Sequence, residues 1–155
     1  MSPLILTLTV VMLALPVALA LGAMLFNRLI NLPVLFFVVI YGWIWTRFRP
    51  TRFVVHQRAL EVIWPLKRRE ISRENITSVR LINRQELTRE IGWGMRVGAG
   101  GLWGGFGWLW TGQRGIVQMY ISRTDHFVWI ERAGDRPWLI TPEQPEDFVR
   151  ALSRQ

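Results

Sequence analysis

Arginine carries most of the chemical potential of this sequence, because its guanidinium group binds carboxylates and phosphates at any physiological pH. All but one of the 19 basic residues, and all eleven acidic residues, follow residue 46, which leaves an excess of seven positive charges in that part of the chain. Such an excess favours contact with an anionic membrane surface. The alternative interpretation is that the arginines reflect a compositional bias and are spread over solvated faces. Two basic groups are dense enough to suggest a binding surface: Arg47, Arg49 and Arg52, and Lys67, Arg68 and Arg69.

Catalytic and metal-binding side chains are scarce. The sequence has no cysteine, which excludes disulfides, thiolate metal sites and cysteine nucleophiles. The two histidines, His56 and His126, lie in apolar or strand-like stretches. Asp125 and His126 are adjacent, and adjacent residues of a strand point to opposite faces, so we do not expect a catalytic pair there. We therefore predict a protein that is not an enzyme and that carries no cofactor and no metal ion.

A glycine-rich segment with large aromatic side chains is the other unusual feature. Ten glycines fall from Gly92 to Gly115, interleaved with four tryptophans and Phe106. A dinucleotide-binding motif that starts at Gly98 and Gly100 needs glycine or alanine at position 103, which is Trp103. No Gly-Lys-Ser/Thr sequence follows for a phosphate loop. The spacing therefore excludes nucleotide binding of either kind.

Two interpretations of this segment remain open. In the first, the glycines form bulges and tight corners, and Trp108 and Trp110 point into a barrel from a short strand. In the second, apolar side chains lie in the membrane interface or bind a membrane protein. We expect the first for Trp108 and Trp110, and the second for Leu102, Trp103 and Phe106. Serine at positions 103 and 106 should then weaken association without unfolding the domain.

The elements that must position these residues begin with two apolar runs. Leu4 to Phe26 contains no charged residue, and as a helix it reaches roughly 34 Å, enough to cross the ~30 Å hydrocarbon core of a bilayer. Leu29 to Trp45 reaches only roughly 25 Å and is the weaker span. We predict a transmembrane helical hairpin over residues 1–46, with spans at about 4–26 and 29–45.

The distribution of arginines around this hairpin predicts its orientation. Three arginines crowd the end of the second run, whereas the turn carries only Arg28. The positive-inside rule then places residues 47–155 in the cytoplasm, which predicts a multi-pass protein of the cytoplasmic membrane. A cleavable signal peptide is the alternative, because Ala18-Leu19-Ala20 has the form of a processing site. Against it, no Lys or Arg precedes the apolar run.

Residues 47–155 should form one small, mainly β domain. Period-two alternation predicts strands at Ala59–Trp64 and Ile116–Ile121, and the short link Thr124-Asp125 predicts that the next strand pairs antiparallel with the second of these. Trp138 to Ile140 then completes a meander of three consecutive strands. A final helix should begin at Thr141, where Thr141–Gln144 has the form of a capping box.

The glycine-rich segment and the last helix together resemble a known family. Met95 to Gly107 contains an arginine followed by a glycine-rich turn, and Leu139 to Phe148 contains the helix start Thr-Pro-Glu-x-Pro-Glu-x-Phe. Both are similar to the bacterial PH-like domain family found behind short transmembrane segments, over roughly residues 53–153. The resemblance implies an α+β, mainly β fold, in which a partly open, seven-stranded antiparallel barrel is capped by a C-terminal helix. Eukaryotic phosphoinositide-binding domains share this shape, but a shared fold does not carry function.

These features predict a membrane-anchored binding module. We expect an adaptor or assembly factor in a cytoplasmic-membrane complex, with anionic lipid headgroups as a further contact. The expected partners are the membrane and another membrane protein or a second copy of the chain, and not nucleic acid. A role in envelope stress or immunity to antibacterial peptides is the alternative. The candidate surface comprises Arg47, Arg49, Arg52, Lys67, Arg68, Arg69, Leu102, Trp103 and Phe106.

Overall fold

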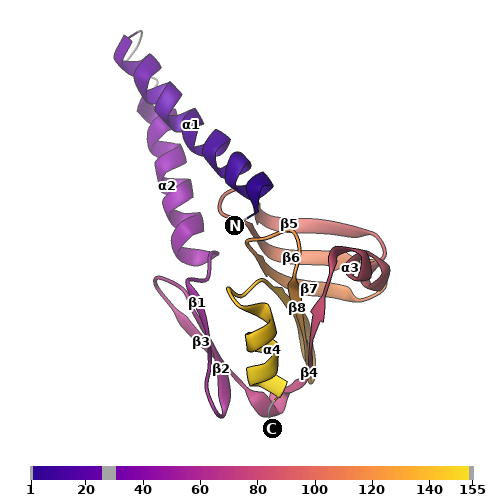
Figure 1. The fold of residues 1–155 in the computed structure, drawn as a ribbon. Helices are drawn as coiled ribbons and strands as arrows, with labels where there is room; N and C mark the ends of the chain where they lie inside the picture. Colours follow the sequence, from indigo (N-terminus) through magenta and orange to yellow (C-terminus); the bar gives the residue numbers. More distant parts are fainter. Residues whose placement is uncertain (1, 26–30, 154–155) are drawn as a thin grey trace.

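Two apolar helices lead the chain in the computed structural model, which describes residues 2–25 and 31–153. They are α1 (Pro3–Leu25) and α2 (Asn31–Arg47), and they converge away from the sheets and diverge toward them (Figure 1). By length and composition α1 could cross a membrane over Pro3–Met24, while α2 is a shorter apolar helix. The predicted span end at Phe26, the turn at Asn27-Arg28 and the second span's start at Leu29 lie outside the described residues.

Within the described residues, nine strands form two sheets that do not close into a barrel. The three-stranded sheet has the order β1 (Arg52–Val55), β2 (Ala59–Ile63) and β3 (Arg68–Ser72), all antiparallel. A short 3-10 helix, η2 (Arg73–Asn75), leads into the second sheet. That six-stranded sheet has the order β4 (Ile76–Ile82), β8 (Phe127–Arg132), β9 (Asp135–Ile140), β7 (Gly115–Ile121), β6 (Gly105–Thr111) and β5 (Gly94–Gly100).

The predicted meander of three consecutive strands is wrong, because β9 lies between β7 and β8. β9 pairs antiparallel with β8 and parallel with β7, so Met119 faces Leu139 across a parallel pair. The link between β7 and β8 must then cross two strand spacings, about 10 Å, which its five residues can reach easily. A short link therefore permits an antiparallel pair without requiring one.

Two further helices complete the fold. α3 (Arg84–Ile91) was not predicted, although its start is marked by a capping box between Asn83 and Glu86, with both hydrogen bonds at 2.9 Å. α4 (Pro145–Ser153) confirms the predicted C-terminal helix but begins four residues late, with proline in its first position. The Thr141 hydroxyl accepts a hydrogen bond from the Ser122 N–H at 2.7 Å, so it is not the cap of this helix.

The six-stranded sheet has a hydrophobic core on each face. On one face the three-stranded sheet and α4 contribute Trp64 and Phe148 to a cluster around Trp138. On the other face α3 packs Leu87 and Ile91 against the sheet. The predicted fold class, a mainly β, partly open barrel with a C-terminal helix and an N-terminal apolar helix, is confirmed. The part of the chain that the structure describes has nine strands, whereas the resemblance implied seven.

Candidate functional site

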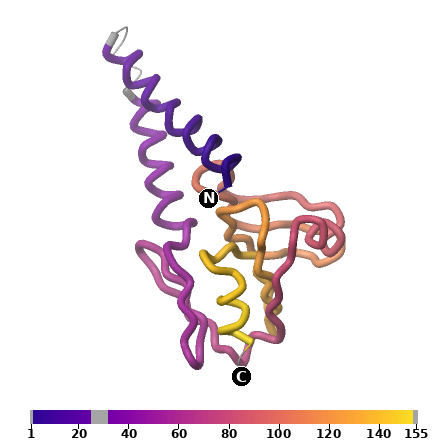
Figure 2. Tube along the Cα trace, viewed as in Figure 1, coloured from indigo at the N-terminus to yellow at the C-terminus, as the bar shows by residue number. Residues whose placement is uncertain are grey.

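The loop between β5 and β6, residues 101–104, lies between the bases of α1 and α2 (Figure 2). The backbone N–H of Trp103 donates a hydrogen bond of 2.9 Å to the hydroxyl of Thr9 on α1. That hydroxyl lies 3.1 Å from the carbonyl oxygen of Gly101, and Thr9 is only 4% exposed. The Trp103 ring packs edge-on against Trp45 of α2, with 4.6 Å between centroids. The loop therefore joins the sheet to both helices.

Glycine makes this loop geometry accessible. Gly101 and Gly104 both have positive φ, and the Gly101 N–H donates to the Gly104 carbonyl oxygen at 3.1 Å. A Cβ at Gly104 would lie 2.1 Å from the Ile121 carbonyl oxygen, which excludes any other residue without movement of the backbone. Trp103 also has positive φ, at 59°, a conformation that is uncommon for a bulky residue. Its contacts with both helices hold it there.

The side chains of the glycine-rich segment are distributed differently from the prediction. Leu102 and Phe106 are each 3% exposed, so they are removed from the candidate surface. Trp108 and Trp110, which were expected inside, are 40% and 46% exposed. Phe106, Trp108 and Trp110 occupy every second position of β6, so their side chains share one face of the strand. Of these three, only Phe106 belongs to the core cluster beneath the three-stranded sheet. A ring on this face is buried where the three-stranded sheet covers it, whatever the type of the residue.

An apolar surface results, which we call the open face: Met95, Val97, Trp108 and Trp110. Met95 pairs with Trp110 and Val97 with Trp108 across β5 and β6, so the four side chains share one side of the hairpin. All four are exposed, and β5 is the edge strand of its sheet. The aromatic residues are evident from the sequence, but the expectation that Trp108 and Trp110 point inward is wrong.

The structure brings the two predicted basic groups toward each other at the end of α2. Burial lowers the pKa of Lys67, and the charges of Arg47, the last residue of α2, and of Arg69 lower it further. Lys67 is the last residue of a tight turn, which is closed by a hydrogen bond of 2.8 Å from the Trp64 N–H to the Lys67 carbonyl oxygen. The Lys67 ammonium lies 4.5 Å from the centre of the Trp64 ring. The basic residues 67–69 thus lie at the β2–β3 hairpin.

A cavity of about 490 Å³ lies where the connection from α2 to β1 passes the ends of β7 and β9. We call it the junction cavity. Its lining is charged and hydroxylated on one part and aromatic on another. The lining residues are Arg49, Pro50, Thr51, Arg52, Phe53, Phe106, Tyr120, Ser122, Thr141, Pro142 and Glu143.

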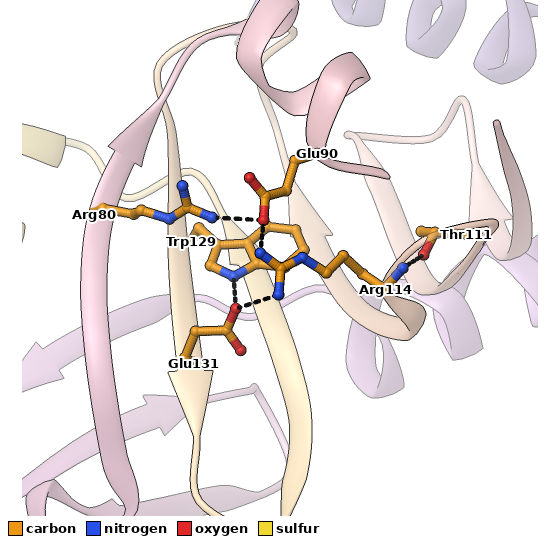
Figure 3. Close-up of polar contacts among 6 residues, drawn as sticks. All are labelled: Arg80, Glu90, Thr111, Arg114, Trp129 and Glu131. Carbon is orange, nitrogen blue, oxygen red and sulfur yellow. Dashed lines mark hydrogen bonds and ion pairs between the residues drawn. The ribbon is translucent and has the colours of Figure 1, made fainter. Parts of the chain in front are cut away.

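A second polar cluster lies on the opposite face of the large sheet (Figure 3). Glu90 of α3 contacts Arg80 at 2.9 Å and also Arg114, and Arg114 approaches Glu131 at 3.8 Å. The Trp129 indole N–H donates to Glu131 at 2.7 Å. Each carboxylate is thus paired with an arginine, and the cluster fastens α3 to the sheet. Among the residues that the structure describes, no group of three or more potential ligands could hold a metal ion.

The two histidines occupy different settings. His56 lies 3.1 Å from the Glu61 carboxylate. His126 has a positive φ of 53° and lies with Asp125 in the link between β7 and β8, not in a strand as expected. Its Nδ1 is 3.9 Å from the Asp125 carboxylate, and both side chains are exposed.

Comparison with known proteins assigns most of the chain to a family. A family model described as "Bacterial PH domain" matches residues 51–155, which run from the residue before β1 to the end of the chain. No curated protein and no solved structure matches the chain.

Proposed function

The chain belongs to the bacterial PH domain family, and we propose that it is a membrane-anchored adaptor or assembly factor in a complex of the cytoplasmic membrane. PH domains are generally non-catalytic modules that bind proteins or lipids. In this proposal residues 1–46 form a two-span hairpin and residues 47–155 form a cytoplasmic binding domain. Anionic headgroups contribute a further contact through the basic residues at the end of α2.

The helices support the membrane part of the proposal. Most apolar side chains of α1 and α2 are exposed, and a helix that is apolar on all sides needs an apolar environment around it. The Tyr41 hydroxyl donates to the Met12 carbonyl oxygen at 2.8 Å and links the two helices. Trp43, Trp45 and Arg47 end α2, as expected at a headgroup boundary with the cytoplasm. A reporter that works only outside the cytoplasm tests this orientation when it is fused after Gln155. Activity of that fusion would contradict the cytoplasmic location of residues 47–155.

The open face is the observation that carries the adaptor role. Exposed tryptophans on β6, beside the exposed Met95 and Val97 of the edge strand β5, are typical of a surface that binds another protein. The hairpin bearing this face is joined at its tip to both helices through Thr9 and Trp45, so the face is held close to the membrane. We propose that another membrane protein binds there, because such a partner can reach the face at that depth.

Photocrosslinking in intact cells tests this role. A photoreactive residue at Val97 or Trp108 should crosslink to a membrane protein, and the same residue at Arg58, which is exposed in the β1–β2 turn, serves as the control. The expected result is a discrete adduct at positions 97 and 108 and none at 58. Adducts to a second copy of the chain would identify self-association as the mode of assembly. Crosslinking no stronger at 97 and 108 than at 58 contradicts the proposal.

A further inference from the structure

The junction cavity has an uncompensated positive charge. Arg49 and Arg52 line it, and within residues 2–25 and 31–153 neither guanidinium forms an ion pair or a side-chain hydrogen bond. Glu143 is the one acid among the lining residues. Hydroxyl groups of Thr51, Ser122 and Thr141 also line the cavity, and those of Ser122 and Thr141 lie 3.2 Å apart. Arginines and hydroxyls are the donors that bind the oxygens of a phosphate.

Arg49 is held in position before any ligand arrives. Its guanidinium carbon lies 4.2 Å from the ring centre of Trp45 and 5.9 Å from that of Trp103. Burial lowers the pKa of this guanidinium from its ordinary value, since no carboxylate offsets the loss of water around the charge. A partly buried cation without a counter-ion is unfavourable, and a bound anion would relieve that cost. Aromatic stacking thus prepares one donor of an anion site.

The other predicted basic group is less available to an outside anion. Arg68 lies 3.7 Å from the Glu61 carboxylate, and Arg69 lies 3.8 Å from the Asp135 carboxylate. Both charges are therefore partly compensated within the domain. Of the two groups, the residues that follow α2 have the stronger case for ligand binding.

The location and the apolar part of the lining indicate which anion would enter. Arg49 follows the last residue of α2 by two positions, at the level where the proposed hairpin leaves the bilayer. Phe53 and Phe106 supply an apolar wall to the same cavity. We propose that the junction cavity binds the phosphate group of an anionic phospholipid, with Arg49 and Arg52 as its charged donors. This inference rests on the proposed membrane anchoring and names a ligand for the domain.

Lipid retention by the full-length protein tests the site. The chain is placed in nanodiscs of phosphatidylcholine with a minor share of phosphatidylglycerol, transferred to mild detergent, and analysed for bound lipid by native mass spectrometry. The wild type should retain phosphatidylglycerol in preference to phosphatidylcholine. Arg49→Gln with Arg52→Gln should reduce retained phosphatidylglycerol about tenfold, the effect of losing one or two charge-assisted hydrogen bonds. Arg58→Gln removes a charge far from the cavity and should change nothing.

Further arms separate the source of the phosphate and the cause of any loss. Retention that survives millimolar inorganic phosphate supports the lipid as ligand, whereas displacement by phosphate supports a site for the free anion. Arg49→Lys keeps the charge but not the planar, stacked donor, so reduced retention in this variant at unchanged thermal stability supports the geometry argued above. Equal retention in the wild type, the double variant and Arg58→Gln overturns the proposal.

Two separate measurements distinguish failure of this site from failure of the proposed function. Insertion of every variant into nanodiscs reports on the membrane hairpin and does not depend on the cavity. Crosslinking at position 108 reports on the adaptor role and does not depend on lipid. If the chain inserts into nanodiscs and crosslinks at position 108 but shows no lipid preference, the proposed function is supported and the phosphate site is contradicted.

Discussion

The tip and the body of the β5–β6 hairpin use the same residue types with opposite results. At the tip, Trp103 lies between two helices, and the glycines on either side of it allow the backbone to turn tightly. In the body, Trp108 and Trp110 remain exposed on a strand pair that no second sheet covers. The difference shows that burial of a tryptophan in this hairpin depends on which element packs against it. Amino-acid composition alone does not distinguish the tip from the body.

Two facing glycines mark the change from tip to body. Gly98 and Gly107 are paired across the strands, and both have positive φ. A Cβ at Gly98 would lie 2.2 Å from the Phe106 carbonyl oxygen, and one at Gly107 would lie 2.4 Å from that of Val97. The two backbones therefore approach each other more closely than side chains would allow. This close approach separates the buried Phe106 from the exposed Trp108.

The largest expected effect compares two aromatic residues on one face of β6. Phe106→Ala should lower the free energy of unfolding by about 3–5 kcal/mol, because it opens a cavity in the core. Trp108→Ala should change it by about 0.5 kcal/mol or less, because that ring is exposed. Denaturant unfolding of the full chain in detergent micelles measures both. A similar loss in the two variants would break the comparison.

The next effect concerns two glycines at the tip. Gly104→Ala should lower the free energy of unfolding by about 2–3 kcal/mol, since the new Cβ meets the Ile121 carbonyl oxygen at a strained backbone conformation. Gly100→Ala is the matched control, because nothing lies within 4 Å of a Cβ at that position. Thermal unfolding of both variants measures the difference. Equal midpoints would show that the loop does not need its tight turn.

A smaller effect separates two threonines of α1. Thr9→Val removes the acceptor for the Trp103 N–H and should cost about 1–3 kcal/mol, with faster hydrogen exchange of the loop amides. Thr7→Val is the control, because the Thr7 hydroxyl only donates to the Pro3 carbonyl oxygen on its own helix, at 3.0 Å. Exchange that is equally fast in both variants would mean that the tip is not held by α1.

The smallest expected effect is a pH dependence at Tyr120, which pairs with Phe106 on the covered side. Burial raises the pKa of the Tyr120 phenol, so the folded state favours the neutral form. Its contribution to stability is complete below the ordinary pKa of about 10 and is lost as the pH rises through the folded value. Relative to Tyr120→Phe, the wild type should therefore lose stability above about pH 10. Parallel curves for the two proteins would show that this phenol does not titrate differently on folding.

Local patterns predicted many of the elements. The two apolar runs predicted the N-terminal helices α1 and α2, and the Pro-Glu-Asp motif predicted the C-terminal helix α4. The capping box of α3 is also visible in the sequence, since Asn83 and Glu86 have the required spacing. Its polar composition, with only Leu87 and Ile91 buried, gave little apolar signal.

Long-range relations were less accessible from the sequence. The insertion of β9 between β7 and β8 depends on pairing energies over the whole sheet, and no local spacing encodes it. The junction cavity combines residues 49–53 with residues from β6, β7 and the start of the last connection, which lie far apart in the chain. The arginines at 49 and 52 were predicted as part of a surface, whereas the enclosure around them could come only from the fold.

Crosslinking between α1 and the hairpin tip tests the central claim most directly, namely that the glycine-rich loop fixes the domain to the helices. The chain has no cysteine, so Thr9→Cys with Trp103→Cys introduces the only two thiols. In native membranes a short thiol crosslinker should join them efficiently, because the Thr9 hydroxyl and the Trp103 N–H lie 2.9 Å apart. Thr9→Cys with Trp108→Cys should react far less. Equal crosslinking of the two pairs, or none in the first, would contradict the account.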